Sequence, residues 1–147
     1  MADEKKRNIV SAEYHGFYVE SRYIGNKCCD RGANSKWSSN FNYHKVTVKN
    51  IETGKWTWFE FWQSLNEKRI RNKEQLLEAF WCFLLDAQAG DNDYAGFCDE
   101  YGYNRYDQHS KQTYKKVRAA RDKAVRVLGG MGEASDMLNR IQEEYNL

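Results

Sequence analysis

The segment from Asp91 to Gly96 is the part of this chain that most resembles a known ligand-binding pattern. Asp91, Asp93 and Gly96 are spaced like the first, third and sixth positions of a calcium loop. Such a loop also needs an oxygen ligand at the fifth position and a bidentate Glu at the twelfth, and these positions hold Ala95 and Gly102. Capping of a helix by Asp91 or Asp93 explains the aspartates better. We therefore predict no metal site.

The histidines and cysteines give no candidate for catalysis. His15, His44 and His109 are far apart, and the chain has neither a C-x-x-C nor an H-x-x-x-H pair of the kind that structural zinc sites favour. A catalytic nucleophile needs a neighbouring base and an orienting group, and the sequence has no nucleophile elbow or Gly-rich phosphate loop. Two of the four cysteines are adjacent and two fall in predicted helices, which fits reduced thiols. We predict a protein that is not an enzyme and needs no cofactor.

Length and composition indicate one soluble domain over residues 1–147. The chain is 41% hydrophobic and 15% aromatic, which is enough for one core, and 30% of its residues are charged. No apolar stretch has the length of a membrane span or the form of a secretory signal, so we expect a cytoplasmic protein without membrane association. We expect a flexible lead-in over residues 1–12, mainly strands over 13–62 and mainly helices over 72–147.

Aromatic and β-branched residues predict an N-terminal antiparallel sheet of about three strands. The first strand covers residues 14–24, with Gly16 as a bulge. Residues 43–49 alternate between apolar and polar side chains and pair with residues 55–62. The connection 50–54 ends in Gly, which is typical of a hairpin loop.

Residues 26–42 show no period and are rich in Asn and Ser around Cys28, Cys29 and Trp37. We predict a long surface loop here. Loops of this length in a small domain often take part in binding.

The strand over residues 55–62 is aromatic on both faces, which is unusual for a sheet with one solvent-facing side. Its side chains divide into two sets, Trp56, Trp58 and Trp62 on one face and Thr57, Phe59 and Phe61 on the other. The strand is therefore either covered on both sides, or one aromatic face is available to a partner.

Apolar residues with a 3.6-residue period predict about four helices in the second half of the chain. Polar side chains that can cap a first turn mark the predicted helix starts, at Asn72, Asp91 or Asp93, and Asp107. Glycines that can end a helix follow at Gly102 and Gly129. A last helix is predicted from about Glu133 to Tyr145. The whole pattern predicts an α+β fold in which an N-terminal antiparallel sheet packs against these helices.

Charge is distributed unevenly along the helical half. Six acids and one base lie between Asp86 and Asp107, whereas seven bases and one acid lie between Lys111 and Arg126. The basic side chains form a stripe along one predicted helix. This stripe is either a solvated face that pairs with the preceding acidic segment, or a ridge for an acidic protein surface or a phosphate backbone.

Tyrosine, tryptophan and arginine dominate binding hot spots, and they cluster at two places in this sequence. We expect Tyr101 to be buried, because it continues the apolar face of its helix, and the residues after Gly102 to lie clear of the core. The predicted partner-binding residues are Tyr103, Arg105, Tyr106, Lys111, Lys115, Arg118, Trp56 and Trp58.

Several residues of uncommon types follow one another in a characteristic order between Tyr43 and Leu128. They are Phe59, Phe61, Trp62 and Ser64, then Phe97, Cys98, Tyr101, Gly102 and Tyr103, and then Tyr114, Lys115 and Val117. In this order they resemble a widespread family of small accessory proteins encoded by bacteriophages and prophages. The chain departs from that pattern in its first 42 residues, at residues 104–106 and after Gly130.

The resemblance implies a context and assigns no activity residue by residue. Phage accessory proteins of this size often act on the bacterial host, for example as anti-CRISPR proteins. Our leading hypothesis is a phage-encoded counter-defence or host-takeover protein that inhibits a bacterial host protein or defence complex by stoichiometric binding in the host cytoplasm. The alternatives are a nucleic-acid-binding phage protein, or a sponge that captures a host nucleotide signal where basic and aromatic groups meet at a pocket.

Overall fold

The computed structural model describes residues 8–29, 39–64 and 69–145. The chain divides into two compact units, residues 1–79 and residues 80–147. The first unit holds an antiparallel sheet and the second is helical, so the predicted α+β class is confirmed. Helix α2 (Lys73–Gly90) contributes its first turns to the sheet unit and its remaining turns to the helical unit.

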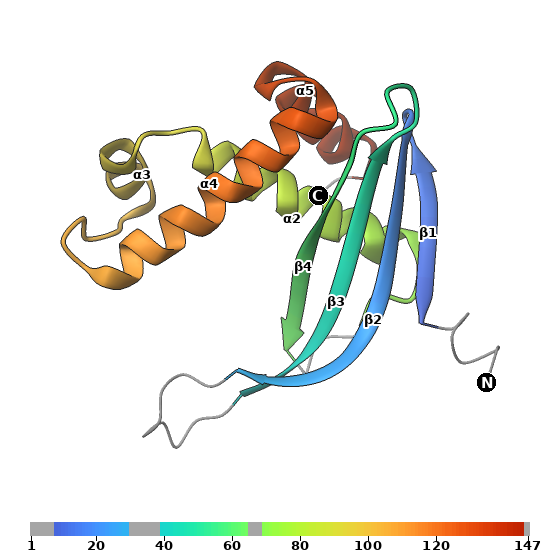
Figure 1. The fold of residues 1–147 in the computed structure, drawn as a ribbon, viewed down its shortest axis with the longest axis horizontal. Coiled ribbons are helices and arrows are strands. Elements are labelled where there is room, and N and C mark those ends of the chain that lie inside the picture. Colours follow the sequence, from blue (N-terminus) through green and yellow to red (C-terminus); the bar gives the residue numbers. More distant parts are fainter. Residues whose placement is uncertain (1–7, 30–38, 65–68, 146–147) are drawn as a thin grey trace. The chain divides into compact units, whose positions relative to one another are not determined.

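The sheet has four strands in the order of the chain (Figure 1). They are β1 (Ile9–Tyr14), β2 (Phe17–Cys29), β3 (Ser39–Asn50) and β4 (Trp56–Ser64). The predicted hairpin of β3 and β4 is confirmed. In the connection between these strands, the side-chain oxygen of Asn50 accepts hydrogen bonds from the amides of Glu52 and Thr53, and Gly54 adopts a positive φ.

The predicted first strand is two strands, and Gly16 lies in the turn between them. His15 and Gly16 have φ values of 46° and 87°, and Tyr14 pairs with Phe17 across them. A two-residue hairpin turn with positive φ at both positions matches the right-handed twist of the flanking strands. The irregularity in β2 falls instead at Gly25, where the register with β3 shifts.

The predicted lead-in and the predicted loop are both partly strand. Ile9 and Val10 already belong to β1. Strand β2 continues to Cys29 and β3 begins at Ser39, and Asn26 pairs with Asn42 between them. The polar sequence of this segment gives no strand signal, but the hydrogen bonds of an antiparallel pair join backbone groups and do not require apolar side chains. The rest of the predicted loop, residues 30–38, lies outside the described residues.

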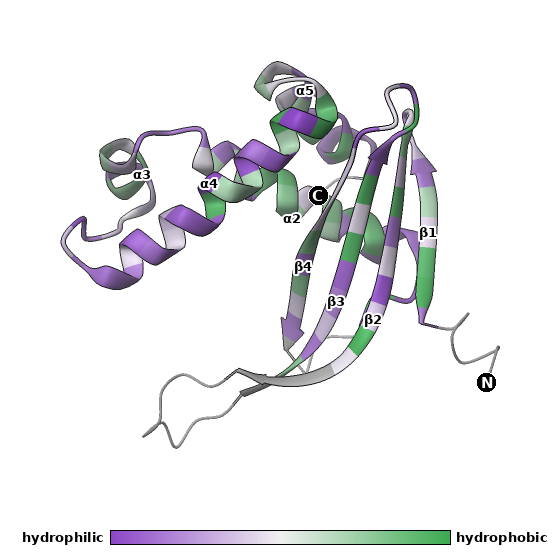
Figure 2. Ribbon diagram, viewed as in Figure 1, coloured by the Kyte–Doolittle hydropathy of each residue, from purple (hydrophilic) through white to green (hydrophobic). Residues whose placement is uncertain are grey.

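Cross-strand neighbours divide the sheet into an inner and an outer face. On the inner face the buried residues Val19, Val48 and Thr57 lie in one cross-strand row, and Val46 lies in the next. Figure 2 shows the alternation of hydrophilic and hydrophobic residues along these strands. Val46 and Val48 share this buried face, which agrees with the predicted alternation over residues 43–49.

His44 on β3 ties the segment that leads into α2 to the inner face. Its Nε2 accepts a hydrogen bond of 3.2 Å from the amide of Ile70, and its Nδ1 lies 3.3 Å from the carbonyl oxygen of Phe61. The ring must therefore be neutral with its proton on Nδ1, because a protonated Nε2 cannot accept a hydrogen bond. Burial lowers the pKa of His44; the bond to Phe61 opposes this shift, and the charge of Arg69 adds to it.

The helices begin and end where the capping residues predict. Asn72 accepts from the amide of Gln75 at the start of α2, Asp93 caps α3 (Tyr94–Tyr101), and Asp107 caps α4 (Gln108–Leu128). Gly102 and Gly129 end α3 and α4 in the left-handed conformation. Helix α5 (Met131–Tyr145) follows directly and buries Met137, Leu138 and Ile141.

The end of α2 crosses the middle of α4 within the helical unit. Glycine at position 90 allows the two helices to approach this closely, because a Cβ here would overlap the carbonyl oxygen of Val117. Beside it, the guanidinium of Arg118 donates to the carbonyl oxygen of Gly90 at 2.9 Å. Ala89 and Val117 lie in the buried cluster at this crossing, together with Phe97 and Cys98 from α3.

Replacement of Gly90 by Ala should destabilise the helical unit by about 3 kcal/mol, because the added methyl group meets a backbone carbonyl that cannot move without its helix. Gly132 is the matched control, since a Cβ there meets nothing within 4 Å. The Gly132→Ala variant should gain about 0.5 to 1 kcal/mol from helix propensity. Urea unfolding followed by far-ultraviolet circular dichroism measures both. Equal effects of the two substitutions would contradict the close contact.

The sheet unit should lose stability in mild acid. The folded pKa of His44 lies below its ordinary value of 6.5, so the unfolded chain takes up a proton first. The stabilisation is complete above about pH 6.5 and is lost as the pH falls from there through the folded pKa. His44→Leu should cost about 1 to 3 kcal/mol at neutral pH, because the amide of Ile70 loses its acceptor, and should flatten this dependence.

Urea unfolding at several pH values, followed by tryptophan fluorescence, measures the slope for each variant. His109→Gln, which changes an exposed histidine in the other unit, serves as the control and should keep the slope of the parent. A His44→Leu variant with an unchanged slope between pH 5 and 7 would show that other groups cause the acid sensitivity.

Candidate functional site

The outer face of the sheet carries aromatic and charged side chains in ordered rows. Trp56 lies opposite Lys49, and Trp58 lies opposite Thr47. The next row places Glu60 opposite Lys45. This register follows from the β3–β4 hairpin, since Asn50 and Lys55 close it with a backbone hydrogen bond of 2.8 Å.

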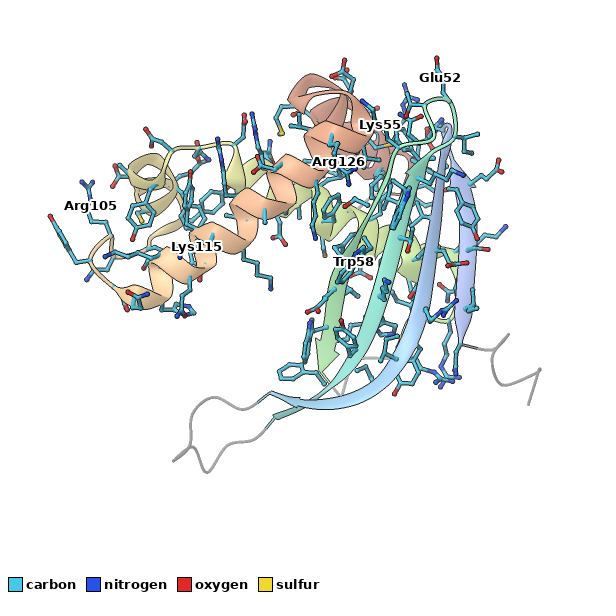
Figure 3. The ribbon with its side chains drawn as sticks, in the orientation of Figure 1. Glu52, Lys55, Trp58, Arg105, Lys115 and Arg126 are labelled. Atoms are coloured by element: carbon cyan, nitrogen blue, oxygen red, sulfur yellow. The ribbon has the colours of Figure 1, made fainter. Side chains whose placement is uncertain are left out.

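Trp56 and Trp58 present large apolar surfaces on this face. They are 53% and 37% exposed. The Nζ atom of Lys45 lies 4.8 Å from the centre of the Trp58 ring, a cation–π contact that holds the ring from one side. Trp58 is labelled in Figure 3, on β4. Two exposed indoles on one regular strand form a rigid apolar surface that needs little ordering upon binding.

Trp62, the third tryptophan of this face, is packed. Its ring makes edge contacts with Tyr43 at 4.9 Å and with Phe41 at 6.0 Å between ring centres. Its Nε1 donates to Glu60 at 3.3 Å. Burial raises the pKa of Tyr43 to about 12, and its hydrogen bond to Glu60 contributes to this shift. Trp62 therefore supports this end of the sheet, whereas Trp56 and Trp58 provide the accessible surface.

In the helical unit, the exposures of the two tyrosines around Gly102 are the reverse of the expectation. Tyr101 is 44% exposed, so the prediction that it is buried is wrong. Tyr103 stacks on Phe97, with ring centres 5.0 Å apart and an angle of 15° between the planes. The left-handed Gly102 reverses the chain, and the amide of Tyr103 then bonds to the carbonyl of Cys98 at 2.9 Å. An apolar contact from the residue after the glycine back to the helix accompanies this motif.

The rest of the loop before α4 is held mainly through its backbone. The hydroxyl of Tyr94 donates to the carbonyl oxygen of Arg105 at 2.6 Å, and the side-chain oxygen of Asn104 accepts from the amide of Tyr106 at 3.0 Å. The guanidinium of Arg105 lies 3.5 Å from Asp99, in an exposed ion pair. Tyr106 is 85% exposed. The loop is therefore a fixed turn that presents one tyrosine and one arginine to solvent.

The basic residues of α4 divide into two groups. Arg118 donates to the carbonyl of Gly90. The Nε of Arg121 bonds to Asp91 at 3.1 Å, an ion pair between α4 and the acidic segment, which is one of the two alternatives that the charge distribution left open. Lys111 and Lys115 are exposed. Figure 3 shows Arg105 on the loop and Lys115 on α4. Only part of the predicted basic stripe is thus available to a partner in this unit.

The two aspartates of the segment that resembles a calcium loop have structural roles. Asp93 caps α3, and Asp91 pairs with Arg121. Over the described ranges, no three His, Cys, Asp or Glu side chains lie close enough together to hold a metal ion. Within the same part of the chain, no helix is both long and apolar enough to cross a membrane.

Several residues of the ordered pattern between Phe59 and Val117 are packing residues. Phe97, Cys98 and Val117 belong to a buried cluster with Ala89, and Tyr103 and Tyr114 pack against it. The hydroxyl of Tyr114 also donates to the carbonyl of Asn92 at 2.8 Å. No protein-family model, curated protein or solved structure matches the chain.

Truncation of the two loop tyrosines should separate their roles. Tyr103→Ala should destabilise the helical unit by about 2 kcal/mol, because it removes the ring that stacks on Phe97. Tyr106→Ala should change the free energy of unfolding by less than about 0.5 kcal/mol, because the side chain is exposed and the bonded amide remains. Urea unfolding followed by circular dichroism decides this. A costly Tyr106→Ala would mean that the loop depends on that ring.

Proposed function

We propose that this protein acts by stoichiometric binding to a bacterial protein, as a counter-defence or host-takeover protein of a bacteriophage. The exposed pair Trp56 and Trp58 is the observation that carries the binding role. Tryptophan is enriched at the centres of protein interfaces, where it buries a large area at a small entropic cost. The order of residues from Phe59 to Val117, which resembles phage accessory proteins, supports the biological setting.

The outer face favours a protein partner over nucleic acid. Both signs of charge lie on this face, with Glu20 and Arg22 on β2, Lys45 and Lys49 on β3 and Glu60 on β4. A surface that follows a phosphate backbone is predominantly basic. Mixed charge around an apolar centre is instead the arrangement of a protein interface with a polar rim.

The loop before α4 is the second surface on which the proposal can be tested. Arg105 and Tyr106 are exposed there, and Lys111 and Lys115 follow on α4. The ion pair of Arg105 with Asp99 is exposed and so contributes little to stability. A double substitution of Arg105 and Tyr106 by Ala should therefore leave the fold intact.

Affinity capture from a bacterial lysate, compared among matched variants, tests the proposal. Trp56→Ala with Trp58→Ala should weaken capture of the partner at least tenfold, which corresponds to about 1.4 kcal/mol. The control is Glu52→Ala with Lys55→Ala, on the hairpin of the same sheet (Figure 3), where both residues form hydrogen bonds through backbone atoms that the substitutions keep. This control should capture the partner as the parent does.

Three results would count against the proposal. Recovery of no specific bacterial protein at near-physiological salt would remove its main support. Capture that nuclease treatment abolishes would favour nucleic acid as the partner. Capture that depends on Arg105 and Tyr106, and not on the tryptophans, would move the binding surface to the loop before α4.

A further inference from the structure

Strand β1 forms one edge of the sheet (Figure 1), and among the described elements β2 alone packs along its length. The pairing of these two strands is regular over all six residues of β1 and contains no bulge. The chain has no proline, and Glu13 is the one charged residue of β1. Natural edge strands commonly carry bulges, prolines or several charges that prevent pairing with another chain. This edge lacks most of those features.

Alternate residues of β1 direct their backbone groups away from β2. The amide of Tyr23 donates to the carbonyl of Asn8 at 2.8 Å, so these two residues form a hydrogen-bonded pair just before β1 begins. Bonded and non-bonded pairs alternate along an antiparallel ladder, and every second residue of β1 therefore turns its N–H and C=O groups toward the free edge. These residues are Ile9, Ser11 and Glu13.

The same three residues share the outer face of the sheet, because Ala12 between them lies opposite the buried Val19. Arg22 lies opposite Ile9 on this face and is exposed. A groove of about 300 Å³, which Ile9 and Arg22 help to line, leaves open space beside this arginine. Among the described residues, neither Arg22 nor Glu13 forms an ion pair.

We propose that two copies of this protein join through β1, as antiparallel edge strands related by a two-fold axis at Ser11. Ser11 then pairs with Ser11 of the second copy, and Ile9 pairs with Glu13 of the second copy. This is the register that pairs all three outward-directed residues, so the N–H and C=O groups at the edge find partners. It also places no like charges directly opposite one another.

Charge complementarity favours a second copy as the occupant of this edge. Glu13 of one copy lies beside Ile9 of the other, and Arg22 flanks the same Ile9 from β2. The α-carbons of this Glu and Arg are then two strand spacings apart, about 10 Å, and their long side chains can meet across Ile9. Two-fold symmetry forms this ion pair twice. A foreign strand would gain the contact only with a carboxylate at the same position.

The dimer goes beyond the proposed binding role and does not depend on it. Its axis stands perpendicular to the sheet, so the outer faces of both copies lie on the same side of one continuous sheet. Trp56 and Trp58 of the two copies are then at opposite ends of that face.

Sedimentation velocity of the full chain at micromolar to submillimolar concentrations, without any partner, tests the dimer. The parent should reach twice the monomer mass of 17.4 kDa. Ser11→Pro should be monomeric, because the proline removes an N–H that faces the free edge and leaves the bonds to β2 in place. Ser11→Thr is the matched control, since it keeps this N–H and should dimerise as the parent does. A parent that stays monomeric at submillimolar concentration would overturn the proposal.

Charge reversal tests the register. Glu13→Arg should weaken dimerisation by about tenfold or more, because it replaces the ion pair with like charges. Combining Glu13→Arg with Arg22→Glu should restore the parent's affinity. Glu52→Arg makes the same change of charge on the exposed β3–β4 hairpin and should have no effect. A dimer that both Ser11→Pro and Glu13→Arg leave intact would use another surface, which would contradict the proposal.

Amide hydrogen exchange of the parent decides the question even if Ser11→Pro folds poorly. The amides of Ser11 and Glu13 should exchange more slowly at high than at low protein concentration, because only the dimer bonds them. The amide of Ala12, which faces β2, should be protected at both concentrations. Exchange of the Ser11 amide that is independent of concentration would rule out this dimer. Since no partner is present, this outcome is separate from that of the capture experiment.

Discussion

The backbone contact between Gly90 and Val117 is the constraint on which the helical unit depends. Because Gly90 has no Cβ, the end of α2 meets α4 backbone to backbone, and Arg118 bonds to the carbonyl of Gly90 across the crossing. Because Gly90 and Val117 are in contact, the chain between them, which contains α3 and the loop after it, must leave this crossing and return to it. Tyr94 and Tyr114 then close over Phe97, and their hydroxyls hold the backbone of the segments on either side of α3. The exposed positions of the loop are a consequence of this arrangement.

Features that arise within a few residues could be predicted from the sequence. The caps Asn72, Asp93 and Asp107 join a side chain to an amide no more than three residues away, so their signals are local and the helix starts were correct. The β1–β2 turn was missed for a related reason. His15–Gly16 forms a turn that usually contains Asn-Gly or Asp-Gly, and the histidine gave no sign that its φ is positive. The aromatic residues on both sides of this turn therefore predicted one continuous strand over residues 14–24.

Exposure was harder to predict than secondary structure. Helical periodicity places Tyr101 beside Phe97, and the two rings lie 5.4 Å apart. The left-handed Gly102 then turns the chain back, Tyr103 stacks on the same Phe97 ring, and Tyr101 stays 44% exposed. The signal was present, since an apolar residue after a helix-ending glycine commonly packs back onto the helix. The sequence carried no comparable signal for the contacts of Arg69. Arg69 reaches Asn8 and Tyr23 across more than forty residues, and only the fold brings them together.

The aromatic residues of this chain fall into two sets, one that packs in a core and one that is exposed on the sheet. Residues of the ordered pattern between Phe59 and Val117, such as Phe97 and Tyr103, pack in a core, so this pattern bears on the fold and leaves the partner unspecified. Trp56 and Trp58 contribute little to filling the sheet's core, because they lie on the face opposite the buried Val46 and Val48. A contiguous exposed apolar surface lowers solubility and favours aggregation unless a partner covers it. Its position on a regular strand, with Lys45 holding one ring, is the reason that we assign it to binding and not to folding.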